Sequence, residues 1–132
     1  MVVSLVYVGR ELQSNTAAVR AASMQAVATA SAEGLQALAL DSAMSSIRVR
    51  GDRDISSLTL EEAQRYENWS RQRWLSFQNV YFQHELGVFD SRVWGAYLNI
   101  ICSVAAIPGE MAEWSTHRAA LDEGFVRLVE SC

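Results

Sequence analysis

The sequence predicts an all-α fold, with one long N-terminal helix followed by a bundle of about four to five shorter helices. Apolar residues recur at spacings of three and four, no segment alternates apolar and polar residues as a strand does, and the 132 residues contain a single proline. Half of the residues are hydrophobic and 20% are charged. We therefore expect one domain with its own core, spanning residues 1–132.

The N-terminal third is expected to be one continuous helix. Residues 10–40 are rich in alanine, the best helix former, and contain glycine only at Gly34. Leu5, Leu12 and Val19 are spaced by seven and so share a face. Such a helix is longer than a domain of this size, so part of it should contact another surface.

The first nine residues, 1–9, form an apolar tip or the remnant of a membrane helix. The apolar run is shorter than the roughly 20 residues that cross a bilayer. It is also too apolar to remain in water, so we expect it to contact a membrane or another protein subunit, including a second copy in a homo-oligomer. The residues expected to make this contact are Val2, Val3, Leu5, Val6, Val8 and Leu12.

Helix starts and stops mark the bundle over 58–132. Thr59 and Glu62 have the spacing of a capping box, and Gly87 is suited to end the helix that follows. Further helix starts are expected at Asp41, Asp90 and Pro108. Residues 51–54 are expected to form a loop, so the Arg-Gly-Asp tripeptide within 50–52 is interpreted as a turn.

Aromatic residues concentrate between Tyr66 and Tyr97, which hold nine of the twelve. Along the first of these helices they share a face with Ser70 at helical spacing, which is typical of a packed core. The alternative is an apolar ligand pocket. Its lining residues would be Trp69, Trp74, Tyr81, Trp94 and Tyr97.

Charge and cysteine content narrow the range of partners and compartments. The net charge is −4 and no basic stripe is present, so no nucleic-acid partner is expected. Cys102 lies in an apolar run and Cys132 is the last residue. Two such cysteines are expected to be free thiols, which fits a reducing compartment.

No catalytic, cofactor-binding or metal-binding residue is predicted. His84, His117 and the two cysteines lack the close spacing of zinc ligands, and the sequence contains no phosphate-binding glycine loop or nucleophile elbow. His84 is expected to be a partly exposed histidine with a satisfied ring. An enzyme would require a deep polar cleft that combines His84 or His117 with a carboxylate.

Three stretches resemble a family of uncharacterised bacterial proteins that have one N-terminal transmembrane helix and a small helical domain. They are residues 2–25, residues 77–83 with Gly87-Val-Phe-Asp90 and Trp94, and Pro108-Gly109 with Trp114. The resemblance implies that this chain begins inside the transmembrane segment. Arg10 and Arg20 would then place the domain on the cytoplasmic side of the inner membrane. The family implies no reaction and no ligand.

Taken together, these observations favour a non-enzymatic, membrane-associated helical module that acts in protein–protein interaction or assembly. The alternative is a soluble ligand-binding or sensor bundle with the aromatic-lined apolar pocket described above.

Overall fold

A computed structural model describes residues 2–132 and confirms the all-α prediction, because these residues contain helices and no strand. The predicted long N-terminal helix is present, and the region after α4 divides into three short helices. The elements are α1 (Val2–Leu40), α2 (Ser42–Arg53), η1 (Ile55–Ser57), α3 (Leu60–Glu85), α4 (Ser91–Ala105), α5 (Pro108–Ala112), α6 (Trp114–Arg118) and α7 (Glu123–Glu130).

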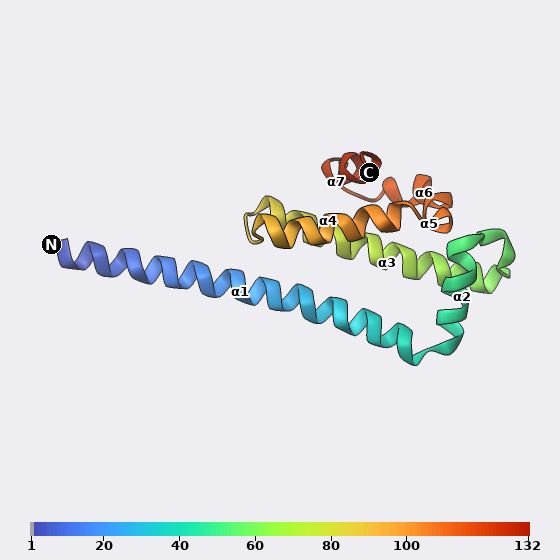
Figure 1. Cartoon of the computed structure of the whole chain (residues 1–132), viewed down its shortest axis with the longest axis horizontal. Coiled ribbons are helices and arrows are strands. Elements are labelled where there is room, and N and C mark those ends of the chain that lie inside the picture. Colours follow the sequence, from blue (N-terminus) through green and yellow to red (C-terminus); the bar gives the residue numbers. More distant parts are fainter. Residues whose placement is uncertain (1) are drawn as a thin grey trace.

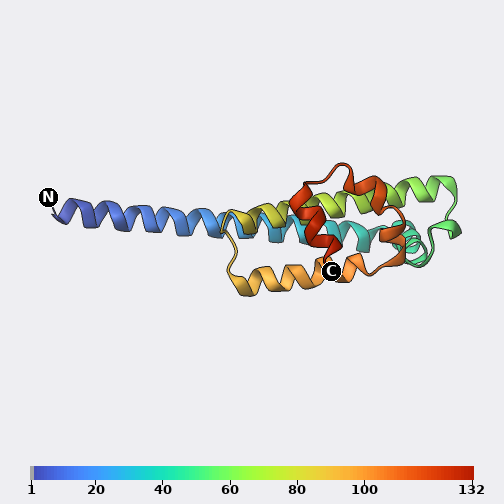
Figure 2. The same ribbon diagram turned by 90° about the horizontal axis from the view of Figure 1, so that it is seen from above.

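Helix α1 is an arm that extends beyond the rest of the protein. Its 39 residues correspond to a length of about 58 Å. Figures 1 and 2 show its N-terminal half projecting past the turn between α3 and α4. Only Val27 of α1 is buried, and it contacts Val80 of α3 and Phe89 of the turn. We refer to the remaining helices as the body.

The core of the body lies between α3, α4, α6 and α7. Helices α3 and α4 run antiparallel, and α7 lies across them (Figure 2). Trp74 of α3 is fully buried, with its ring centroid 4.9 Å from that of Trp114 and 6.4 Å from that of Phe125. The buried members of this core are Trp74, Ile101, Val104, Trp114, Phe125, Val126 and Val129.

The predicted helix boundaries are confirmed where they depend on local signals. Thr59 and Glu62 form the capping box at the start of α3, and Asp90 accepts hydrogen bonds from two backbone N–H groups at the start of α4. Gly87 ends α3 with a φ of 72°, a conformation that glycine adopts without steric cost. A hydrogen bond from Arg50 is the main cause that lowers the pKa of Glu62 to about 2.

The loop predicted at residues 51–54 is wrong, because α2 continues through Gly51 to Arg53. Gly51 lies at a close contact between helices, where a side chain would not fit. A Cβ atom on Gly109 of α5 would lie 1.9 Å from the Gly51 carbonyl oxygen, and one on Gly51 would lie 2.5 Å from the Tyr66 ring. The two glycines therefore allow α2, α3 and α5 to approach each other closely.

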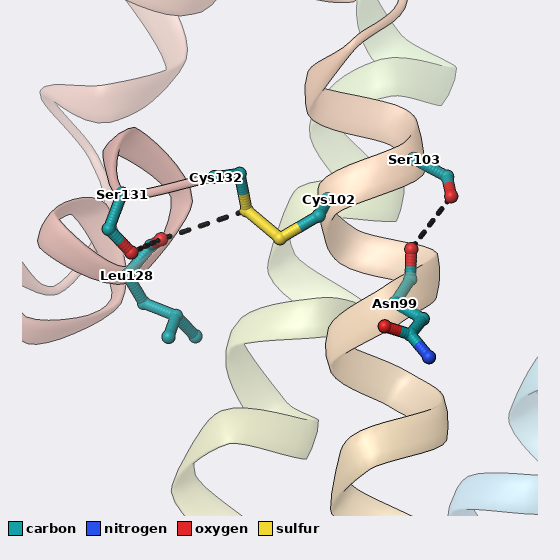
Figure 3. The surroundings of a disulfide bond; sticks show 6 residues. All are labelled: Asn99, Cys102, Ser103, Leu128, Ser131 and Cys132. Atoms are coloured by element: carbon teal, nitrogen blue, oxygen red, sulfur yellow. Dashed lines mark hydrogen bonds between the residues drawn. A yellow bond between two sulfur atoms is a disulfide. The ribbon is translucent and has the colours of Figure 1, made fainter.

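The prediction of two free thiols is also wrong. Cys102 of α4 and Cys132, just after α7, form a disulfide, with their Cα atoms 5.2 Å apart (Figure 3). The two cysteines are 30 positions apart in the sequence, and the segment between them contains α5, α6 and α7 and folds back so that the chain end returns to α4. The distance between the two cysteines along the sequence does not indicate that they lie close together in space.

We expect the double variant Cys102→Ser/Cys132→Ser to lower the free energy of unfolding by about 3–4 kcal/mol, because the unfolded chain loses a constraint on a loop of this length. Urea denaturation followed by circular dichroism measures the change. Reductant should lower the midpoint for the wild type and have no effect on the variant. A wild-type midpoint that reductant leaves unchanged would contradict the disulfide.

Candidate functional site

A cluster of buried polar side chains lies where α3 meets α5 and α6. It consists of Tyr66, Ser70, Arg73, Glu110 and His117, and we call it the polar cluster. Ser70 and Glu110 are fully buried, and His117 is 3% exposed. Buried groups of this kind are stable only when they are hydrogen-bonded and their charges are paired.

Glu110 is the centre of the polar cluster, and three side chains of α3 contact it. The Ser70 hydroxyl donates to Oε2 over 2.6 Å, and the Tyr66 hydroxyl lies 3.3 Å from Oε1. The Arg73 guanidinium forms an ion pair with Oε1 and compensates the buried charge. The Tyr66 hydroxyl also lies 2.9 Å from Asp52 Oδ1, so the cluster is linked to α2 as well as to α3, α5 and α6.

His117 joins the polar cluster through Ser70, whose Oγ lies 3.1 Å from His117 Nε2. The single hydroxyl hydrogen of Ser70 is donated to Glu110. The Ser70 oxygen therefore accepts from His117, which places the imidazole proton on Nε2. Burial lowers the pKa of His117, and the Arg71 guanidinium lowers it further, so the ring is neutral near pH 7.

Three buried nitrogens in or beside the cluster have no hydrogen-bond partner among residues 2–132: Arg73 Nε, His117 Nδ1 and Trp74 Nε1. The other core tryptophan differs, since Trp114 Nε1 donates to Glu130 Oε1 over 3.1 Å. His117 and Trp74 both line one pocket of about 290 Å³ between α3 and α6. Of the five residues predicted to line an aromatic pocket, this pocket includes only Trp74.

Sequence reasoning missed Glu110 and assigned no partner to His117. The available signal was Ser70, a small polar residue in the middle of the predicted core face between Tyr66 and Trp74. A polar residue there requires a polar partner. The partners could not be identified, because Glu110 and His117 are 40 and 47 residues away along the chain.

The five aromatic residues of the alternative pocket are divided among different surroundings. Trp74 lies inside the main core, and Tyr81 and Trp94 pack against it. Tyr97 stacks on Phe89 beside the buried Val27 of α1. Trp69 is partly exposed and lies under the Arg73 guanidinium, 4.0 Å from its ring centroid. The five residues therefore lie in three different surroundings, and the aromatic-lined pocket stays a prediction.

His84 is half-buried, as expected, but its ring is not fully satisfied. It stacks on Trp94 with ring centroids 4.1 Å apart, and its Nδ1 has no hydrogen-bond partner among the described residues. The stack uses the face of the ring, and the turn after α3 supplies no donor or acceptor for that nitrogen.

The residues predicted to contact a membrane or partner lie on the projecting half of α1. Their exposed fractions range from 49% for Val8 to 83% for Val3, and Leu12 is 62% exposed. Met1 lies outside the described residues. Among residues 2–132 nothing covers these side chains, and the predicted contact remains a prediction.

The described part of the chain contains no helix that is both long enough and apolar enough to span a bilayer. Nor do residues 2–132 bring together three or more His, Cys, Asp or Glu side chains that could hold a metal ion.

Comparison with models of known families, with curated proteins and with solved structures found no match. The resemblance to single-helix bacterial membrane proteins therefore remains a prediction.

We expect Glu110→Ala to lower the free energy of unfolding by about 3–5 kcal/mol, because it leaves the Arg73 charge buried without a partner. Chemical denaturation measures the loss. Glu113→Ala, a change to a nearby carboxylate outside the polar cluster, is the control and should cost less than about 0.5 kcal/mol. If Glu110→Ala and Glu113→Ala lower the free energy of unfolding equally, the buried Glu110 carboxylate does not stabilise the polar cluster.

Acidification should destabilise the protein through His117. In the unfolded chain this histidine has its ordinary pKa of about 6.5, whereas burial lowers its pKa in the folded state. The unfolded state therefore binds more protons below about pH 6.5, and the stabilisation present above that pH is lost as the pH falls. Denaturation midpoints between about pH 8 and pH 5.5 measure this slope, which should be shallower in His117→Gln. If the wild type and His117→Gln lose stability equally as the pH falls, His117 is not the group that causes the loss.

Proposed function

We propose that this protein is a non-enzymatic helical module that assembles through the projecting half of α1, with the apolar tip seated against another protein subunit or a membrane. The observation that carries the proposal is the exposure of the tip in the single chain. All the predicted contact residues are uncovered there, although burial of each large apolar side chain is worth roughly 1.5–3 kcal/mol.

The tip is apolar around most of the helix circumference. At 100° per residue, Val2, Leu5 and Val6 fall within about 100° of one another, and Val3 and Val8 on either side extend the apolar arc to about 220°. A helix segment that is apolar on all sides is normally enclosed by a protein core or by lipid. This segment is about 10 Å long, so it could enter a subunit or one leaflet of a bilayer without crossing it.

Beyond the tip the apolar surface of α1 narrows to one face. Leu12 and Val19 continue the seven-residue spacing from Leu5, and they are 62% and 57% exposed. A stripe of this kind is suited to contact another helix, as in a coiled coil. It supports a protein partner next to the tip, including a second copy of the chain.

The polar cluster supports a structural role for the body. The Ser70 hydroxyl and the Glu110 carboxylate are fully buried and already bonded to each other and to their neighbours. A nucleophile or general base must reach a substrate, and these groups do not reach the surface. They stabilise the position of α5 and α6 on α3, which supports a body that carries the arm.

The disulfide bears on the compartment of the body. Arg10 and Arg20 favour the cytoplasmic side, but disulfides persist mainly in oxidising compartments. A covalent bond within the body is the stronger argument, so we propose that the body faces an oxidising compartment. Thiol labelling of protein isolated with alkylating agent present decides between the two sides.

The decisive experiment changes the tip and leaves the body intact. We expect Leu5→Asp/Val6→Asp to give a smaller particle with nearly unchanged helix content, because two charges at the tip oppose burial. Light scattering measures the particle mass, in plain buffer and with anionic phospholipid vesicles. Gln13→Asp/Ser14→Asp adds the same charge further along α1 and serves as the control.

The outcomes separate the possible partners. An oligomer that only the tip variant dissociates identifies a protein subunit as the partner. A monomer that binds vesicles, and loses binding only in the tip variant, identifies a membrane. A wild-type protein that is monomeric in buffer and does not bind vesicles contradicts the proposed function.

A further inference from the structure

The exposed side of α1 carries a heptad repeat that begins at the tip and ends beside the body. In a heptad, positions a and d form the seam that contacts a partner helix. With Leu5 at position a, the seam is apolar at every position up to residue 26 except Asn15, and the next two seam residues, Thr29 and Glu33, are polar. The seam residues are Leu5, Val8, Leu12, Asn15, Val19, Ala22 and Ala26, and all of them are exposed.

The charged residues of this stretch lie outside the seam. Arg10 and Arg20 occupy positions f and b, which face away from a partner helix. Glu11 occupies position g, and in a parallel pair it lies opposite position e of the next heptad, which is the uncharged Thr16. Two copies of the seam therefore meet without bringing like charges together, as a self-pairing surface requires.

The contact between α1 and the body leaves the seam open. Val27, the buried residue of α1, packs against α3 and the turn that follows it. Val27 occupies position b, which at 3.5 residues per turn points about 130° away from the centre of the seam. The N-terminal half of α1 also projects past the turn between α3 and α4 (Figures 1 and 2). A second helix can therefore lie along the seam while the body keeps its place.

Asn15 selects both the partner and its direction. An amide enclosed in an apolar seam needs a group that can donate and accept hydrogen bonds. In a parallel, in-register pair of identical helices, position d faces position d, so Asn15 meets the same residue of the second copy and one amide donates to the other. In an antiparallel pair, a faces d, and Asn15 would face an apolar residue such as Leu12 or Val19.

We propose that two copies of this protein pair their arms as a parallel, in-register coiled coil over residues 5–26. This inference rests on the proposed function, because it names the partner of the projecting half of α1. The length is about three heptads, near the minimum at which such a pattern indicates a coiled coil. The bodies lie on opposite sides at one end of the pair. The tips meet at the other end, where Val2, Val3 and Val6 lie outside the seam and form one shared apolar surface.

The first test compares two neighbouring charge substitutions in the full-length, disulfide-bonded protein. We expect the wild type to be a dimer in analytical ultracentrifugation. Leu12→Asp should raise the dissociation constant about 100-fold or more, because each chain loses one seam contact and two like charges face each other. Gln13→Asp adds the same charge at position b and should change the constant less than about threefold. Both variants should keep the helix content of the wild type.

The second test determines direction and register by cysteine crosslinking. The native cysteines are bonded to each other, so an introduced cysteine is the one free thiol. Ala22 lies at position d and its neighbour Ala21 at position c, and both are exposed. With oxidised glutathione, Ala22→Cys should form a covalent dimer on a non-reducing gel, because only the seam brings two equivalent Cα atoms within reach of a disulfide. Ala21→Cys should remain a single chain.

Several results would overturn the pairing, and they are distinct from failure of the proposed function. A wild type that is monomeric at every concentration rules out the pair, whereas vesicle binding that only Leu5→Asp/Val6→Asp abolishes would still support the proposed function. A dimer that Leu12→Asp leaves intact makes its contact elsewhere. Equal crosslinking of Ala21→Cys and Ala22→Cys excludes a defined seam. A covalent dimer that forms between Leu5→Cys and Ala22→Cys chains, but not from Ala22→Cys alone, shows an antiparallel pair.

Discussion

The burial of the Glu110 carboxylate is the constraint on which the body depends. A carboxylate removed from water is tolerated only when its charge and its lone pairs are matched, and here α3 supplies all three matching groups. Helix α5 has only five residues and would not be stable by itself. The ion pair with Arg73 and the hydrogen bond from Ser70 therefore determine where α5 lies on α3. The position of α6 follows, because His117 bonds to the same serine.

This arrangement requires close contact between helices, and the glycines make it possible. Gly51 and Gly109 bring the backbones of α2 and α5 together, so that the Tyr66 hydroxyl reaches both Asp52 and Glu110. Any larger side chain at either glycine would separate these helices. The disulfide acts at the other end of the same unit, because it holds α7 against α4. A body with a small core is thus stabilised by a buried ion pair and a covalent bond in addition to apolar packing.

The arm and the body have different physical characters. The body encloses its polar groups and aromatic rings, whereas α1 contacts it through Val27 and leaves its apolar N-terminal half in solvent. Local helix propensity supports the arm, since alanine-rich sequence needs little help from tertiary contacts to remain helical. The proposed function assigns this apolar segment, which lies far from the core of the body, to a contact outside the chain.

The amino-acid sequence by itself determined what depends on neighbouring residues. The helical periodicity, the capping box at Thr59, the caps at Asp41 and Asp90, and the stop at Gly87 all involve groups within a few residues of each other, and all were predicted. The tertiary structure alone decided the disulfide, the polar cluster and the helical conformation of Gly51. Each of these depends on a partner from a distant part of the chain: Cys102 meets Cys132, Ser70 meets Glu110, and Gly51 meets Gly109. Such contacts form only after the helices pack: Ser70 on the core face signals that a polar partner is needed, but the neighbouring sequence does not identify that partner.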